Sequence, residues 1–168
     1  MATKQGCKQP FLMIRLRRCL ALLTCALGFF ATSPSLAQSG PQARLEQIEL
    51  RAGLHLIRAE VAASDNARAT GLMFRDRLNA NEGMLFVFER AQRQCFWMRN
   101  TLIPLSIAFI ADDGGIINIS DMHPQSEQAH CSARPVRFAL EMEQGWFARR
   151  AIGAGTRLRG PEGLFKAR

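Results

Sequence analysis

Residues able to hold a ligand gather in one stretch of this chain, from Gly71 to Ile110. Five polar or aromatic residues stand there among apolar runs: Arg75, Trp97, Arg99, Asn100 and Thr101. Guanidinium and amide groups bind anionic or polyhydroxylated molecules, and an indole offers a flat stacking face. If the fold brings these side chains together, they predict a cleft for a small polar ligand, either sugar-like or anionic.

The same residues also have a structural interpretation. Asn100 and Thr101 can form an Asx-type turn between two strands, which keeps backbone groups paired. The two arginines can instead pair with a carboxylate and hold a helix onto a sheet, with Glu141 and Asp76 as candidate partners. The residue types alone leave both interpretations open.

Soft metal ligands form a second candidate cluster. Met122 and His123 are followed by His130 and Cys131, all within ten residues. Thioether, imidazole and thiolate ligands suit Cu(I), so one alternative function is copper binding. The competing interpretation of the methionines is that they fill gaps in the core.

Enzyme signatures are missing from the chain. It has no Gly-rich phosphate loop, Cys-x-x-Cys pair or Gly-x-Ser-x-Gly elbow. None of the three histidines stands beside a serine or cysteine in a pattern that indicates an activated nucleophile. The sequence therefore favours a binding or accessory module without a cofactor over an enzyme of an unrecognised class.

The first 37 residues have the build of a secretory signal peptide. A basic segment ending at Arg18 precedes an apolar stretch of 13 residues, Cys19–Ala31, and then the small-residue sequence Ser35-Leu36-Ala37. The apolar stretch is shorter than the roughly 20 residues that span a bilayer. We expect cleavage after Ala37, no transmembrane segment afterwards, and a periplasmic or secreted protein. A flexible leader, residues 38–45, and one domain, residues 46–168, would follow.

Export changes the meaning of the charge. The full chain has 22 basic and 14 acidic residues, but five of the basic ones lie in the expected signal peptide. The remaining net charge of +3 gives no electrostatic case for nucleic-acid binding. The partners expected are a small polar ligand or an envelope protein, and the protein is expected to be a monomer.

Two cysteines remain after the expected cleavage, Cys95 and Cys131. In an oxidising compartment the simplest outcome is one disulfide between them. Metal ligation and two buried free thiols are the alternatives, because separation along the chain does not establish that the two residues approach each other.

The elements that would position these residues are mostly strands. Turn residues at Asp112–Gly115 predict a hairpin, and the alternation in Val136–Glu143 predicts a half-exposed strand. Ser64–Asn66 offer N-caps for a helix over 67–75. Other expected strands are 54–61, 83–88, 95–98, 105–110, 116–119 and 156–159, with helical turns in 145–152. The fold class is mainly β, a small single-domain β-sandwich or barrel with one or two short helices.

Several motifs in order resemble the domain of unknown function 192 family of small bacterial and archaeal proteins. They are GLM-x-R (71–75), GMLF (83–86), FWM-x-NT-x-IPL (96–105) and a later LE that contains Glu141. The resemblance implies a mainly β fold without an established activity. Family members commonly carry Asp after IPL, where this chain has Ser106, and a hydroxyl cannot replace a carboxylate in acid–base chemistry.

The processing expectation has a direct test. The intact mass of the protein from a periplasmic extract should correspond to a chain that begins at Gln38. Retention of the first 37 residues in a membrane fraction would contradict both the localisation and the charge argument.

Overall fold

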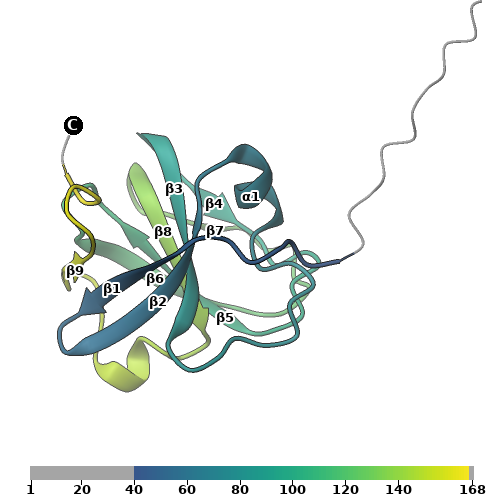
Figure 1. Ribbon diagram of the computed structural model, residues 1–168. Coiled ribbons are helices and arrows are strands. Elements are labelled where there is room, and N and C mark those ends of the chain that lie inside the picture. The colour runs from purple at the N-terminus through teal and green to yellow at the C-terminus, as the bar shows by residue number, and fades with distance from the viewer. Residues whose placement is uncertain (1–39, 167–168) are drawn as a thin grey trace, which may run out of the picture. The chain divides into compact units, whose positions relative to one another are not determined.

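The computed structural model describes residues 40–166, which are built mainly of strands (Figure 1). The expected signal peptide and residues 38 and 39 of the leader lie outside the described residues. The elements in chain order are β1 (Gln47–Ala52), β2 (His55–Ala62), α1 (Asp65–Thr70), β3 (Glu82–Gln92), β4 (Cys95–Phe96), β5 (Leu105–Ile110), β6 (Ile116–Met122), β7 (His130–Cys131), β8 (Val136–Glu143), the 3-10 turn η1 (Ala148–Arg150) and β9 (Leu158–Arg159).

Seven strands form one curled sheet in the order β6-β5-β8-β3-β2-β1-β9, and β4 and β7 form a separate two-stranded arm. All pairs in the large sheet are antiparallel except β2 and β3. Parallel neighbours need a crossover connection, and residues 63–81 supply it. This crossover carries α1, which Figure 1 shows beside β4.

The curl brings the two edges of the sheet together at one end. Ile116 donates its N–H to Thr156 O at 2.9 Å, and Leu158 donates to Gly114 O at 2.8 Å. These bonds link the start of β6 to the segment that enters β9. The expected mainly β fold is confirmed, and the sheet has the form of a half-barrel.

Apolar side chains cover both faces of the sheet. On the inner face, Leu85, Leu140 and Trp146 belong to one buried cluster. On the outer face, Met84 and Phe86 belong to a second cluster that includes residues of the crossover. Burying two faces requires far more apolar residues than a one-sided sheet, which agrees with the continuous apolar runs in β3 and β5.

The expectation of a half-exposed strand over Val136–Glu143 is wrong. Every residue of β8 from Val136 to Met142 is buried, including Arg137 and Glu141. Alternation in this strand separates one buried face from another, because β8 lies between β5 and β3 and both sides of the sheet are covered. A buried acidic residue, Glu141, therefore lies on an interior strand of the sheet.

Gly83 permits the close approach of β3 to β8. A Cβ atom added at this position would lie 2.4 Å from the backbone oxygen of Glu141 and 2.4 Å from the sulfur of Met142. Neither contact is sterically allowed. Only glycine therefore fits at position 83 in the register that places it opposite Met142.

The predicted helix is present as α1, which begins at Asp65, two residues before the predicted start, and ends earlier than predicted. Ser64 is the N-cap, with its side chain accepting from the N–H of Ala67. The predicted end at Arg75 is wrong, because α1 stops at Thr70 and Gly71 follows with φ +50°. No helix in residues 40–166 is long and apolar enough to cross a membrane.

Two strands have no counterpart among the expected elements. β1 pairs with β2 through a two-residue connection that contains Gly53 at φ +59°. β7 contains only His130 and Cys131, which is too short to give a periodic pattern. The predicted hairpin around Asp112–Gly115 is present as β5 and β6.

Candidate functional site

A cavity of about 420 Å³ opens on the outer face of the sheet, between the crossover and the β4–β7 arm. We call it the Glu141 pocket, after the acidic residue in its lining. Its other main residues come from α1 and the turn after it, from β3 and from the segment around β4: Arg68, Gly71, Met73, Phe86, Phe88, Cys95, Phe96, Trp97 and Thr101. The volume suits a small molecule.

Glu141 is the most unusual residue of this pocket. It is 4% exposed, and within residues 40–166 its carboxyl group has no hydrogen-bond or ion-pair partner. Burial raises the pKa of Glu141 from 4.5 to about 8. The group is therefore mainly protonated at neutral pH and can donate a hydrogen bond to a bound molecule. Buried polar groups are rarely left without a partner, which makes Glu141 a candidate functional residue.

The strand register places Glu141 on the pocket side. It lies opposite Met84 on β3 and Ile107 on β5, and both of these residues belong to the outer core cluster. Side chains alternate along a strand, so Leu140 and Met142 point to the inner core. Register and alternation together direct the carboxyl group toward the cavity.

Aromatic rings form the walls of the Glu141 pocket. The ring of Phe96 lies edge-on to Phe86 at 4.8 Å between centroids and to Phe88 at 6.3 Å. Trp97 is 52% exposed, which is unusual for an indole and leaves a stacking surface open to solvent. Gly71 keeps space beside Phe86, since a Cβ there would be 3.1 Å from the ring.

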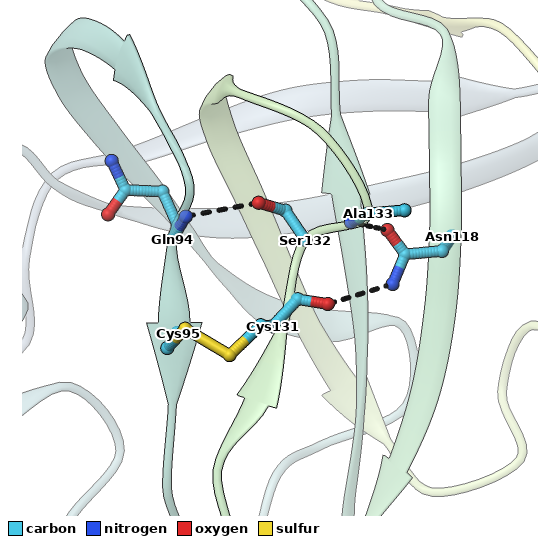
Figure 2. The surroundings of a disulfide bond; sticks show 6 residues. All are labelled: Gln94, Cys95, Asn118, Cys131, Ser132 and Ala133. Carbon is cyan, nitrogen blue, oxygen red and sulfur yellow. Dashed lines mark hydrogen bonds between the residues drawn. A yellow bond between two sulfur atoms is a disulfide. The ribbon is translucent and has the colours of Figure 1, made fainter.

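The wall that carries Phe96 and Trp97 is fixed by the β4–β7 arm. The structure contains the expected disulfide between Cys95 and Cys131, which closes a sequence separation of 36 residues. Figure 2 shows the hydrogen bonds around it. Asn118 on β6 donates its side-chain amide to Cys131 O at 3.2 Å, and Gln94 donates its N–H to the hydroxyl of Ser132 at 3.0 Å.

Among residues 40–166, Arg68 is the one cationic side chain that lines the Glu141 pocket, and its guanidinium already has partners. It donates to the backbone oxygens of Val87 at 2.9 Å and of Ala63, and it pairs with Asp65. The guanidinium also lies over the ring of Phe88, 5.3 Å from its centroid. Arg68 therefore braces α1 against β3 and is poorly placed to bind an anion.

Of the five predicted ligand-binding residues, only Trp97 and Thr101 line the Glu141 pocket. Arg75 is 8% exposed and makes two hydrogen bonds to Glu60, at 3.1 and 3.0 Å, with its Nε atom buried and unpaired. Glu60 also accepts from the N–H of Leu45 at 2.9 Å. The predicted convergence of Arg75 on Trp97 is therefore wrong, because Arg75 is one half of a buried ion pair.

The other two predicted residues lie outside the cavity lining. Arg99 is exposed and lies 3.8 Å from the carboxylate of Glu127. Asn100 has φ +59° in a turn that is closed by the bond from Thr101 N–H to Met98 O. Its own carbonyl accepts from Phe74 at 2.8 Å, so this turn is tied to the crossover. Asn100 therefore lies in a turn closed by a backbone hydrogen bond and not in the lining of the cavity.

The four candidate metal ligands do not form a site. The sulfur of Cys131 is in the disulfide, and Met122 is fully buried in the outer core cluster. No group of three or more His, Cys, Asp or Glu side chains within residues 40–166 could hold a metal ion. His123 and His130 are left without the soft partners that the copper hypothesis needs.

Ser106 is held by hydrogen bonds to other parts of the fold. It is buried at 1%, donates to the Asp121 carboxylate, and accepts the N–H of Gly145 at 2.8 Å. It is next to Ile107 on β5, so it points to the opposite face from the Glu141 pocket. The missing Asp at this position therefore removes no carboxylate from the cavity.

The fold and motifs place the chain in a family. The sequence profile of DUF192, described as an uncharacterized ACR, matches residues 47–160, and the chain belongs to this family. A search of curated proteins gave no match.

Two crystal structures are similar to this chain. One is of a "putative transcription regulator" from Sinorhizobium meliloti 1021, with 33% sequence identity and a TM-score of 0.68, covering 71% of this chain and 97% of that chain. The other is of a protein of unknown function from Novosphingobium aromaticivorans DSM 12444, with 34% identity and a TM-score of 0.64, covering 77% of this chain and 91% of that chain.

Substitutions of Arg75 and Arg99 should have different effects on stability. Arg75→Ala should lower the free energy of unfolding by about 3–5 kcal/mol, because it leaves Glu60 buried without its main partner. Arg99→Ala, at an exposed pair, should change it by less than about 0.5 kcal/mol. Chemical denaturation of both variants measures the difference. Equal effects would contradict the assignment of Arg75 to the core.

The raised pKa of Glu141 should make the stability of the protein depend on pH. A carboxyl whose pKa is higher in the folded state stabilises fully below the unfolded value of 4.5, and this stabilisation is lost as the pH rises toward 8. Glu141→Gln should therefore become more stable than the wild type over this interval, by on the order of a few kcal/mol. Denaturant melts at a series of pH values test this, with Glu89→Gln as an exposed control. A constant difference between variant and wild type would show that folding does not raise the pKa of Glu141.

Proposed function

We propose that the protein is an exported, monomeric binding module that holds a small molecule in the Glu141 pocket. The observation that carries this proposal is the unpartnered, 4% exposed carboxyl group in an aromatic-lined cavity. A fold loses stability by burying a polar group that has no partner, so a ligand that supplies the partner gives the arrangement a purpose.

The composition of the lining favours binding over acid–base catalysis. Glu141 and Arg68 are the ionisable side chains in the lining, and the guanidinium of Arg68 is already engaged. A single carboxyl group can donate or accept one proton, but hydrolytic mechanisms that use paired carboxylates need a second one nearby. The half-exposed indole of Trp97 instead suits contact with a ligand at the mouth of the pocket.

The exported location remains our proposal from the basic segment, the short apolar stretch and Ser35-Leu36-Ala37. A disulfide between Cys95 and Cys131 agrees with an oxidising compartment. The regulator designation of the Sinorhizobium relative finds no support in this chain's charge, since residues 38–168 carry +3.

A blocking variant tests the proposed site. Ala69 is exposed on α1 and lines the pocket, so Ala69→Trp should fill its mouth without entering the core. Ligand-observed NMR with a panel of monosaccharides, small ammonium compounds and small carboxylates should find compounds that bind the wild type. Their affinity should fall at least tenfold in Ala69→Trp.

Asn66→Trp is the matched control, because Asn66 is exposed on the same helix and lies outside the pocket lining. It should bind the same compounds as the wild type. Binding that survives Ala69→Trp would place the site elsewhere, and a panel with no binder to the wild type would remove the basis of the proposal.

A further inference from the structure

We infer that the ligand of the Glu141 pocket is a small organic cation, an ammonium group held between the aromatic walls and the carboxylate of Glu141. This inference rests on the proposed function and names the ligand class for the same site. An ammonium group pairs with a carboxylate and is attracted to the faces of aromatic rings, and the pocket offers both kinds of group.

The aromatic lining matches the requirements of a cation. Phe86, Phe88, Phe96 and Trp97 all border the cavity. Arg68 already lies over Phe88, 5.3 Å from the ring centroid, so one of these rings is in contact with a positive charge. The pocket of about 420 Å³ leaves space for a compact ammonium compound beside these rings.

The charges around the pocket argue against an anion. Arg75 is committed to Glu60, and Arg99 lies on the surface beside Glu127. The guanidinium of Arg68 is paired with Asp65 and bonded to Val87 O. An anionic ligand could therefore bond to Glu141 only while that carboxyl group is protonated, and the described residues of the lining offer it no cation without a partner.

A neutral ligand would use the pocket less completely. It could accept a hydrogen bond from the protonated Glu141, but it would not make use of the ring faces as a cation does. A cation instead converts Glu141 to its carboxylate and gains an ion pair inside an apolar cavity, where such pairs are weakly screened.

Binding of a cation should release a proton from Glu141. The free carboxyl is mainly protonated at neutral pH, because burial raises its pKa to about 8, and an adjacent cation lowers that pKa. The proton passes to the buffer as the ion pair forms. Affinity should therefore rise up to about tenfold per pH unit below pH 8 and level off above it.

Other charged groups near Glu141 are already balanced or lie at the surface. From α1, Arg68 faces the pocket with Asp65 as its partner. Glu60, on the same row of the sheet beyond Met84, is paired with Arg75. Glu143, two residues further along β8, is exposed and paired with Arg149. β5 contributes the apolar Ile107. Glu141 is thus the group expected to titrate on binding.

A matched pair of probes tests the cation requirement. Choline carries a quaternary nitrogen, and 3,3-dimethyl-1-butanol is its uncharged isostere, with carbon in that position. Isothermal titration calorimetry at pH 6, 7 and 8, with tetramethylammonium and glucose as further probes, measures affinity. Buffers of different ionisation enthalpy report the protons released. We expect an ammonium probe to bind at least tenfold more tightly than the isostere, with affinity rising with pH.

Glu141→Gln keeps the shape of the side chain and removes its charge. Its preference for the ammonium probe over the isostere should fall at least tenfold, and binding of the ammonium probe should no longer depend on pH. Thermal melting checks that the variant is folded, and the pH series on the wild type does not depend on it.

The outcomes separate the two proposals. Equal or tighter binding of glucose or the isostere, or pH-independent binding of the ammonium probes, would overturn the cation inference and leave the binding module standing. The same holds if no ammonium probe binds while another compound of the NMR panel binds in an Ala69→Trp-sensitive manner. Absence of any such binder overturns both.

Discussion

The burial of β8 on both faces is the constraint on which the rest of the structure depends. The strand lies between β5 and β3, with one apolar cluster on each side of the sheet, so each of its side chains from Val136 to Met142 is shielded from water. Ala139 and Glu141 face the outer layer, where the carboxyl group of Glu141 must either find a partner or remain protonated. At Gly83, β3 approaches β8 so closely that a Cβ atom would not fit in the observed register.

Two buried glutamates on one row of the sheet show how different their roles can be. Glu60 and Glu141 flank Met84 from neighbouring strands. Glu60 accepts two bonds from Arg75 and one from the backbone of Leu45, which ties the start of the domain and the crossover to β2. Glu141 lacks such partners and faces a cavity. The first glutamate joins separate segments, and the second leaves bonding capacity for a molecule that enters the pocket.

Features with local causes could be predicted from sequence, and features with distant causes could not. The Asp112–Gly115 hairpin and the Ser64 cap follow from residues a few positions apart. The alternation in β8 correctly indicates a strand. Whether its side chains are exposed depends on α1 and the β4–β7 arm, which come from remote parts of the chain and cover the outer face of the sheet. Arg75 was assigned to the cleft because its partner, 15 residues earlier, is not visible in a linear pattern.

The candidate site itself was only half visible in the sequence. Trp97 and Thr101 were expected and do line the pocket. Glu141 was noted both as a possible arginine partner and as part of the LE motif, and a carboxylate within a strand that is otherwise mostly apolar was a usable signal of a site.

The parallel pairing of β2 and β3 has a consequence for how the pocket can vary. Its crossover covers the pocket yet contributes no strand to the sheet, so its loops can change in length or sequence while the strand pairing is kept. Ligand preference in such a fold can therefore diverge during evolution without a new scaffold.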